Sequence, residues 1–246
     1  MKIYNSTDEI NMEEEKKSLL KNICLIPARG GSKRIPKKNI IDFRGKPMIA
    51  HTIEAALKSK LFDGQIYVSS DSAEILKIAK RYKVKTIKRP ARISGDKATL
   101  EDASLHLLNK VEKRFDYLCL LMPNCPLRRA EDVKKSYRII LKAKADCLMS
   151  VVSYHWLKPF WVMWEKNQRL KMFFGKKYLV DSKELPKSIY CPTGAVRWIK
   201  VDNFLREKKY YGRNLIKYEI PFERSADIDN YEDLALAKKL YKYELC

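Results

Sequence analysis

Residues 24–39 read CLIPARGGSKRIPKKN. The apolar run at residues 23–28 has the length of a buried strand, and Gly30 and Gly31 break it into a loop. The cations that crowd this loop are Arg29, Lys33, Arg34, Lys37 and Lys38. The loop suits a phosphate, because glycine lets backbone N–H groups approach anionic oxygens and the cations neutralise their charge. A solvated basic loop is the competing interpretation, since the spacing matches neither a Walker loop nor GxGxxG.

Strands and helices alternate at short intervals on both sides of this loop. We predict strands at residues 23–28, 65–69, 84–87, 117–122 and 147–152, with 117–122 central because it is the most apolar. We predict helices at residues 47–59, 72–82, 100–112, 131–144 and 231–241. This order is typical of an α/β fold with a single Rossmann-like, mostly parallel sheet and helices on both faces. Ligands then bind beyond the carboxyl ends of the strands, where the basic loop lies.

Composition narrows the class of protein. A chain of 246 residues suits one main domain, which we place at residues 22–246 after a polar N-terminal extension at residues 1–21. The formal net charge of +21 favours anionic partners, but the lysines are spread over every segment and no nucleic-acid-binding motif is present. The six cysteines lack CxxC spacing, and no run approaches the ~20 apolar residues of a membrane span. We therefore expect a cytoplasmic protein without a membrane partner.

The basic loop resembles a known signature. Residues 27–33, PARGGSK, followed by Lys38 and Asn39, are similar to the nucleotide-binding motif of the CMP-sialic acid synthetases, also called acylneuraminate cytidylyltransferases. The motifs GKPMI at residues 45–49 and SSD at residues 69–71 extend a resemblance that runs from about residue 23 to about residue 240. It implies that the nucleotide contacts in this loop are Ala28, Arg29, Gly30, Lys33 and Asn39. It also implies catalytic roles for Arg29, Lys33 and Lys38.

A second segment bears on the nucleotide. Asp96 and Thr99 are both good N-cap types, so the residues alone favour a capped junction between a loop and a helix. The family carries a similar Arg-Pro followed by Ser-Asp-x-Ala, and this resemblance implies that Arg89 and Asp96 contact the nucleotide. Gly95 stands where the family usually has the serine, so a contact from that hydroxyl has to come from elsewhere.

Two further segments resemble the acceptor side of the family's site. Residues 122–128, MPNCPLR, are similar to its Gln-Pro-Thr-Ser-Pro-Leu-Arg, and residues 192–195, PTGA, to its Pro-Asn-Gly-Ala. The resemblance implies sugar contacts from Met122, Asn124, Arg128, Thr193 and Gly194. Met122 replaces a glutamine and Thr193 an asparagine, and a thioether cannot make the hydrogen bonds of an amide. The identity of the sugar therefore stays open.

Residues 153–190 interleave aromatic side chains with lysines. This pattern fits a base-stacking surface for single-stranded nucleic acid. It also fits an extended arm that pairs with a second subunit, because aromatic residues are enriched in interfaces. In the family this region is the dimerisation arm, so we expect an inserted arm and a homodimer.

Asp227 and Asp229 alternate around Ile228 near the end of the chain. In an extended segment both carboxylates lie on one side, which makes ligation of a hard cation easy. In the competing interpretation, Asp229 or Asn230 merely caps the last helix. The family has a matching Ser-x-Asp-Ile-Asp and uses it for Mg²⁺, and both interpretations are compatible.

The resemblance implies an enzyme that transfers CMP from CTP to the anomeric hydroxyl of an acidic nine-carbon sugar and releases pyrophosphate. A related nucleotidyltransferase for another acidic sugar, such as 3-deoxy-manno-octulosonate, keeps the same loops and is separated only by its substrate. A basic nucleic-acid-binding protein is the remaining alternative.

Overall fold

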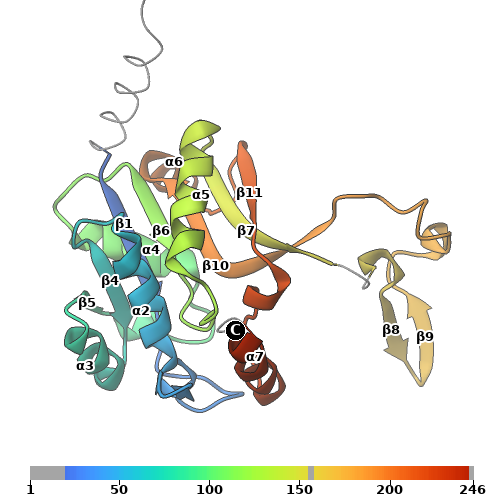
Figure 1. Cartoon of the computed structure of the whole chain (residues 1–246), viewed down its shortest axis with the longest axis horizontal. Helices are drawn as coiled ribbons and strands as arrows, with labels where there is room; N and C mark the ends of the chain where they lie inside the picture. Colours follow the sequence, from blue (N-terminus) through green and yellow to red (C-terminus); the bar gives the residue numbers. More distant parts are fainter. Residues whose placement is uncertain (1–19, 155–157, 244–246) are drawn as a thin grey trace, which may run out of the picture.

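The computed structural model describes residues 20–154 and 158–243. Its core is a seven-stranded sheet in the order β11-β7-β10-β6-β1-β4-β5 (Figure 1). The strands are β1 (Asn22–Pro27), β4 (Ile66–Ser70), β5 (Lys85–Lys88), β6 (Tyr117–Leu120), β7 (Cys147–Ser153), β10 (Tyr190–Lys200) and β11 (Leu215–Glu219). All neighbouring pairs are parallel except that β10 runs antiparallel to both β6 and β7. The predicted mostly parallel sheet is confirmed, with β6 at its centre.

Helices cover both faces of the sheet, as predicted. On one face α2 (Met48–Ser59), α3 (Ala73–Arg81) and α5 (Ala130–Lys142) bury apolar side chains against β1 and β4 and around Trp198. On the other face α4 (Leu100–Lys110) and α6 (Val201–Glu207) pack around Phe204 and Tyr210. The last helix, α7 (Tyr231–Tyr243), packs with the short hairpin of β2 (Asp42–Phe43) and β3 (Lys46–Pro47). The single-turn 3₁₀ helices are η1 (Lys38–Ile40), η2 (Ala91–Ile93), η3 (Pro159–Trp161), η4 (Lys176–Tyr178) and η5 (Phe222–Arg224).

Helix α4 shows how local sequence places an element near the ligand edge. Thr99 accepts a hydrogen bond from the Asp102 N–H (3.1 Å), and the Asp102 carboxylate accepts one from the Thr99 N–H (2.9 Å). This reciprocal capping box satisfies two N–H groups that the first turn leaves without a helical partner. Of the two N-cap candidates in the sequence, Thr99 is therefore the N-cap of α4, and Asp96 lies in the preceding loop.

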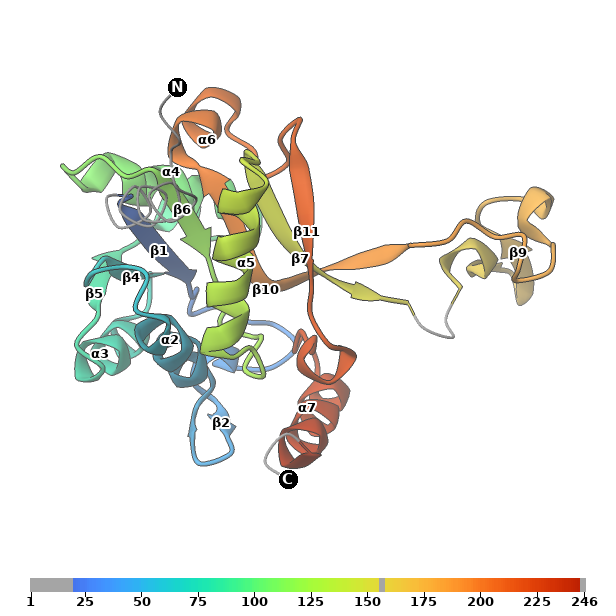
Figure 2. The same cartoon turned by 45° about the horizontal axis from the view of Figure 1, so that its top comes forward.

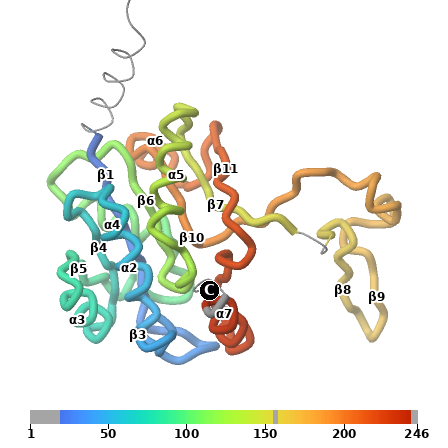
Figure 3. Tube along the Cα trace, viewed as in Figure 1, coloured from blue at the N-terminus to red at the C-terminus, as the bar shows by residue number. Residues whose placement is uncertain are grey.

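An arm leaves the body between β7 and β10 and carries the hairpin of β8 (Met163–Lys166) and β9 (Arg169–Met172) (Figures 2 and 3). Ser153 pairs with Tyr190, so the chain departs and returns through adjacent strands. Several apolar side chains of the arm are exposed, and Leu170 and Phe173 are 68% and 63% exposed. The predicted extension at residues 1–21 lies almost wholly outside the described residues, of which Leu20 is the first.

The described residues contain no helix that could span a membrane, and their cysteines are free. Within residues 20–154 and 158–243, none of the helices combines the length and the apolar composition needed to cross a bilayer. The cysteines found free in that part of the chain are Cys24, Cys119, Cys125, Cys147 and Cys191, and all but the last are buried. The interpretation of most cysteines as small buried hydrophobic residues is therefore confirmed for the described positions.

Candidate functional site

Backbone contacts anchor the basic loop at the carboxyl ends of β1 and β4. The Ala28 N–H donates to the Ser69 carbonyl (2.9 Å), and the Gly30 N–H donates to Oδ1 of Asp71 (2.8 Å). A Cβ at Gly30 would lie 2.9 Å from the Cβ of Ser72, so the close approach requires glycine here. The loop is thereby fixed against the start of α3, at the edge where ligands of parallel sheets bind.

Asn39 supports the basic loop through a hydrogen bond to its backbone. Its side chain is buried, and its Nδ2 donates to the carbonyl of Arg29 (2.9 Å). Lys37 precedes η1 in a left-handed conformation, with φ at 53°, which turns the chain so that Asn39 points back under Arg29. This contact holds Arg29 in place, and a direct contact from Asn39 to nucleotide stays a prediction.

Arg29 and Lys33 meet the second predicted nucleotide segment across the edge of the sheet. Arg29 Nη1 lies 3.2 Å from Oδ1 of Asp96 and 3.5 Å from the Gly95 carbonyl, and Lys33 Nζ lies 2.6 Å from Oδ2 of Asp96. The hydrogen bond and charge of Lys33, with those of Arg29, hold the pKa of Asp96 below its ordinary value. These side chains remain exposed, so the cations are held near one another without being withdrawn from solvent.

Arg89 lies buried behind this group, at the end of β5. Its Nη2 donates to the Ser69 carbonyl (2.7 Å) and its Nε to the Ser69 hydroxyl (3.2 Å). Burial lowers the pKa of the Arg89 guanidinium, and the nearby charge of Asp71 opposes that effect. Arg89 thus adds a positive charge to the same strand ends that hold the basic loop.

Lys38 links the basic loop to the carboxylate pair that follows β11. Lys38 Nζ lies 2.8 Å from Oδ1 of Asp229 and donates to the Ile228 carbonyl (2.9 Å), and Arg34 Nη2 lies 2.8 Å from Oδ2 of Asp229. Residues separated by about 190 positions therefore meet. A pocket of about 290 Å³ opens between them and is lined by Arg29, Ser32, Lys33, Arg34, Lys38, Asn39 and Asp229.

Asp227 and Asp229 have opposite electrostatic environments. Burial raises the pKa of Asp227, and the charge of Asp229 raises it further. Burial also works against the charged form of Asp229, but the hydrogen bond and charge of Lys38, with those of Arg34, outweigh it and lower the pKa of Asp229. Asp229 is thus the more acidic member of the pair.

Asn124 joins the carboxylate pair to the predicted acceptor segment. Its Nδ2 donates to Oδ1 of Asp227 and to the Ile228 carbonyl (3.2 Å), and the Ile228 N–H donates back to the Asn124 carbonyl (2.9 Å). The sequence predicted Asn124 as a sugar contact and Asp227 as a metal ligand. The structure brings the two into direct contact.

Gly194 lies in close contact with the turn that follows β6. A Cβ at Gly194 would lie 2.9 Å from Cγ of Met122 and 3.0 Å from Sγ of Cys125. Thr193 is buried beside it and shares a hydrogen bond of 2.7 Å with the hydroxyl of Ser150. Met122, Thr193 and Gly194 are therefore neighbours, while their contacts to a sugar stay predictions.

Arg128 is directed into the protein. Its side chain is only 3% exposed, and its Nη1 donates to the carbonyls of Ala195 (2.7 Å) and Met122 (3.2 Å). Its Nη2 donates to Oγ1 of Thr52 (2.5 Å). Arg128 thus fixes the turn after β6 to β10 and α2, and its predicted contact to the sugar would have to act through the groups that it positions.

The predicted site residues therefore gather along one edge of the sheet, from Arg89, directly after β5, to Asp229, after β11. Sequence reasoning did not assign site roles to Asp71, which holds Gly30, or to Arg34, which pairs with Asp229. The SSD motif and the run of cations in the loop are the signals that contain them.

Comparison with known proteins identifies the family of this chain. A family model described as cytidylyltransferase matches residues 23–244. The pseudaminic acid cytidylyltransferase of Campylobacter jejuni subsp. jejuni serotype O:23/36 (strain 81-176) is 35% identical over 229 residues, which cover 91% of this chain and 97% of that protein. The N-acylneuraminate cytidylyltransferase of Streptococcus agalactiae serotype III (strain NEM316) is 32% identical over 219 residues, which cover 87% of this chain and 52% of that protein.

The fold is also shared with a solved structure. A CMP:2-keto-3-deoxy-manno-octonic acid synthetase complexed with CTP superposes with a TM-score of 0.66 at 20% identity, over 91% of this chain and 99% of that one. The match over residues 23–244 decides the family, together with the relative at 35% identity, of which this chain covers 97%. The chain therefore belongs to the cytidylyltransferase family, and its predicted resemblance to the CMP-sialic acid synthetases is confirmed.

Proposed function

We propose that this cytidylyltransferase transfers CMP from CTP to the anomeric hydroxyl of an acidic nine-carbon sugar and releases pyrophosphate. The observation that carries the proposal is the pocket of about 290 Å³ in which the cations of the basic loop face Asp229. Such a pocket offers positive charge to a triphosphate and carboxylate oxygens to its counter-ion.

In this reaction the sugar hydroxyl oxygen forms a bond to the α-phosphorus of CTP, and the bond from that phosphorus to pyrophosphate breaks. The hydroxyl proton passes to water. Such a displacement depends on positioning and on charge stabilisation more than on covalent help from the protein. Arg29, Lys33 and Lys38 supply positive charge to the leaving pyrophosphate, while Arg89 and the loop at Asp96 lie where the nucleoside end would bind. Because Asp96 is exposed, its ion pairs with Arg29 and Lys33 cost little to exchange for phosphate.

The carboxylate pair suits Mg²⁺ by its donor chemistry. This ion prefers oxygen ligands and commonly takes one or two carboxylates with phosphate oxygens and water. No group of three or more His, Cys, Asp or Glu side chains gathers within residues 20–154 and 158–243, so phosphate oxygens and water would supply the ligands beyond Asp227 and Asp229. When bound, the ion would neutralise negative charge on the phosphate oxygens. Without the ion, Lys38 and Arg34 neutralise the negative charge of Asp229.

Among acidic sugars we favour pseudaminic acid as the acceptor. The Campylobacter jejuni relative at 35% identity is named for that sugar. Met122 and Thr193 replace the glutamine and asparagine usual in CMP-sialic acid synthetases, so the hydrogen-bonding groups offered to the sugar differ from those expected for N-acetylneuraminic acid.

We further propose that the arm mediates a homodimer. Leu170, Phe173 and Leu179 are each more than half exposed on the arm, and a surface of this kind commonly marks a protein interface. The cytoplasmic location predicted from the sequence remains a prediction.

The function is tested by measuring pyrophosphate release from CTP and Mg²⁺ with pseudaminic, legionaminic and N-acetylneuraminic acids and 3-deoxy-manno-octulosonate. UTP, ATP and GTP replace CTP as controls. We expect release that requires CTP and is fastest with pseudaminic acid. Release with 3-deoxy-manno-octulosonate alone would move the enzyme to another sugar class, and no release with any pair would contradict the proposal.

A further inference from the structure

Three buried polar atoms on the acceptor side of the site lack hydrogen-bond partners within the described residues. They are Oδ1 of Asn124, an acceptor, and two donors, Nε of Arg128 and Nε of Arg197. Buried polar atoms in folded proteins are nearly always hydrogen-bonded, and an exception calls for a missing partner such as a ligand. Asn124 precedes Cys125, and Arg197 follows Gly194, whose backbone approaches Sγ of Cys125, so both belong to segments that meet at this turn.

The strand β10 directs Arg197 toward the carboxyl end of β6. Arg197 pairs with Leu120, the last residue of β6, and follows Gly194 by three positions. Side chains alternate along a strand, and Trp198 enters the core beneath α2, α3 and α5 while Ile199 enters the core beneath α4 and α6. Arg197 therefore lies on the α4 and α6 face, at the edge where the ligand site of this fold is found.

The guanidinium of Arg197 makes no ion pair with any carboxylate in the part of the chain that the structure describes. Its charge also acts on the turn after β6, because it lowers the pKa of Cys125 against the stronger effect of burial. A guanidinium with a buried donor that lacks a partner in the described residues offers a place for an anion.

The anion is better explained by the acceptor than by CTP. The triphosphate has the cations of the basic loop, whereas Arg197 follows Gly194 on β10, and Gly194 approaches the turn containing Cys125. A guanidinium presents a planar fork that matches a carboxylate. Arg128, which the family resemblance predicts for the sugar, is nearly fully buried and uses both Nη groups on carbonyls and a hydroxyl inside the protein, so only its Nε lacks a partner in the described residues.

We infer that Arg197 binds the carboxylate of the acidic sugar and that Oδ1 of Asn124 accepts a hydrogen bond from a hydroxyl or amide N–H of the same sugar. This inference rests on the proposed function and assigns a specificity-determining residue to it. Arg197 is then the residue that makes the enzyme require an acid rather than a neutral sugar.

The inference is tested with steady-state kinetics on Arg197→Met and Arg197→Lys, using CTP, Mg²⁺ and pseudaminic acid. Arg206→Met is the matched control, because it removes the same charge from an exposed position on α6. We expect KM for the sugar to rise about 10–100-fold in Arg197→Met, the range expected for one charged hydrogen-bonded contact, with KM for CTP unchanged within about twofold. Arg197→Lys should recover part of the loss.

A second measurement compares pseudaminic acid with its carboxamide analogue in each protein. The wild type should have a higher kcat/KM for the acid than for the carboxamide. Arg197→Met should largely abolish this preference, and Arg206→Met should keep it. Simple misfolding cannot produce this pattern, because it would lower activity with both sugars alike. If the wild type is active and Arg197→Met has an unchanged KM for the sugar, the inference about Arg197 is overturned while the proposed function stands. The same holds if Arg197→Met raises KM for CTP instead of KM for the sugar. Absence of wild-type turnover with every sugar overturns the proposed function and the inference with it.

Discussion

At the scale of single residues, Arg29 connects the two loops that we assign to the nucleotide. Its guanidinium is held by Asp96 on one side, and its carbonyl is held by Asn39 on the other. We expect Arg29→Ala to lower kcat by about 10²–10³-fold, as expected for the loss of one donor to developing charge, without a change in thermal unfolding. Pyrophosphate release and a thermal melt measure the two quantities.

Lys37 provides the matched control for this prediction. It belongs to the same loop, but its Nζ pairs with Glu74 (2.8 Å), outside the set of residues that line the pocket. Lys37→Ala should retain nearly full turnover. Equal losses in the two variants would show that general loop charge, and not the position of Arg29, supports catalysis.

Gly194 is required at its position for steric reasons. In Gly194→Ala the new methyl group would meet Met122 and Cys125 at distances that force one of them to move. We expect the free energy of unfolding to fall by about 1–3 kcal/mol, as for other overpacked sites. Gly31→Ala, where nothing lies within 4 Å of the new Cβ, is the control in the same urea titration and should change stability by less than about 0.5 kcal/mol.

Individual residues also show how far sequence reasoning reaches. The motifs predicted that Arg29, Lys33 and Asp96 belong together, because such motifs preserve residue types at fixed spacing. They did not predict that Arg128 turns inward or that Arg197 makes no ion pair with the residues that the structure describes. Both outcomes depend on the strand β10, whose register shifts between Pro192 and Arg197 and cannot be derived from local pattern.

At the scale of elements, Asp132 ties the first turn of α5 to the segment that leads into the carboxylate pair. Its carboxylate is buried and accepts hydrogen bonds from the Tyr218 hydroxyl (2.7 Å), from Nη2 of Arg224 (2.7 Å) and from the Arg129 N–H (2.8 Å). The position of Asp227 on the chain after β11 therefore depends on the N-terminus of a helix from the middle of the chain.

We expect Asp132→Ala to reduce the free energy of unfolding by about 3–5 kcal/mol, because it leaves the charge of Arg224 without this buried partner. The neighbouring Glu131→Ala is the control, since Glu131 is exposed and approaches Lys134 only at 3.9 Å. It should cost at most about 0.5 kcal/mol in the same urea titration. A loss in Asp132→Ala no larger than that of the control would contradict the proposed tie.

The stabilisation by Asp132 should depend on pH in a defined direction. Burial alone would raise the pKa of Asp132, but hydrogen bonds from Arg224 and Tyr218 outweigh it and lower the pKa in the folded protein. A depressed folded pKa means stability that is present above the unfolded pKa of about 3.9 and is lost as the pH falls through the folded pKa. The difference between wild type and Asp132→Ala should therefore be constant near neutral pH and shrink below about pH 4, and a difference that grows on acidification would refute the prediction.

Elements with strong periodicity and end signals were predicted to within a few residues, as for α2, α3 and α5. The elements that sequence reasoning missed are α6, β11 and the short hairpins. Strand β11 lies at the edge of the sheet and is mostly exposed, so burial does not impose an apolar run on it. Helix α6 has only seven residues, too few for a clear helical period.

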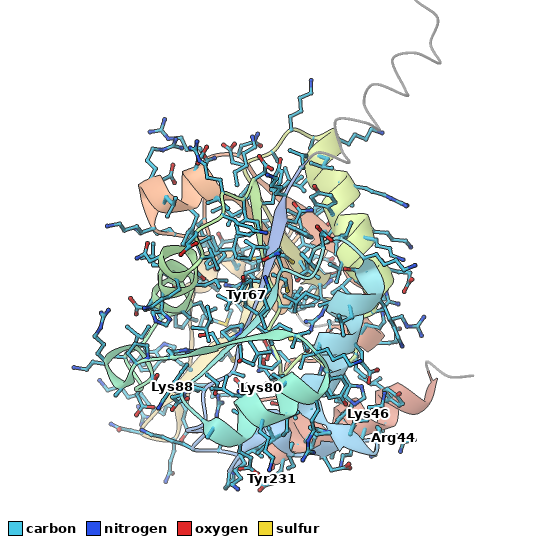
Figure 4. The ribbon with its side chains drawn as sticks, turned by 90° about the vertical axis from the view of Figure 1, so that its left-hand side faces the viewer. Arg44, Lys46, Tyr67, Lys80, Lys88 and Tyr231 are labelled. Carbon is cyan, nitrogen blue, oxygen red and sulfur yellow. The ribbon has the colours of Figure 1, made fainter. Side chains whose placement is uncertain are left out.

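At the scale of the whole molecule, the net charge of +21 is distributed over the surface. Figure 4 shows nitrogen-tipped side chains extending on all sides of the face that carries Lys80 and Lys88. Such a distribution supports weak, salt-sensitive attraction to polyanions. We expect a single-stranded oligonucleotide to bind with a dissociation constant of about 10⁻⁴–10⁻⁶ M at physiological salt, measured by fluorescence anisotropy. Tighter, salt-resistant binding would revive the nucleic-acid-binding alternative.

The oligomeric state follows from the arm if its apolar side chains meet a second copy. We expect Leu170→Asp with Phe173→Asp to convert a dimer into a monomer in sedimentation velocity. Leu236→Asp changes an exposed leucine of α7 and should leave the dimer intact. A wild-type protein that stays monomeric at micromolar concentration would exclude the arm as a dimer interface.

The return of the chain from the arm through β10 also has a consequence for the order of folding. Strand β10 pairs with β6 and β7, both of which precede the arm, so its contacts close only after the whole excursion has been synthesised. Loop closure costs grow slowly with length, but long-range pairings form late in folding. Gly194 and Arg197 lie on β10, which is the last strand in the sequence that pairs with a neighbour on each side. A chain emerging from the ribosome thus displays its phosphate-binding loop early and completes its acceptor site only when the sheet is finished.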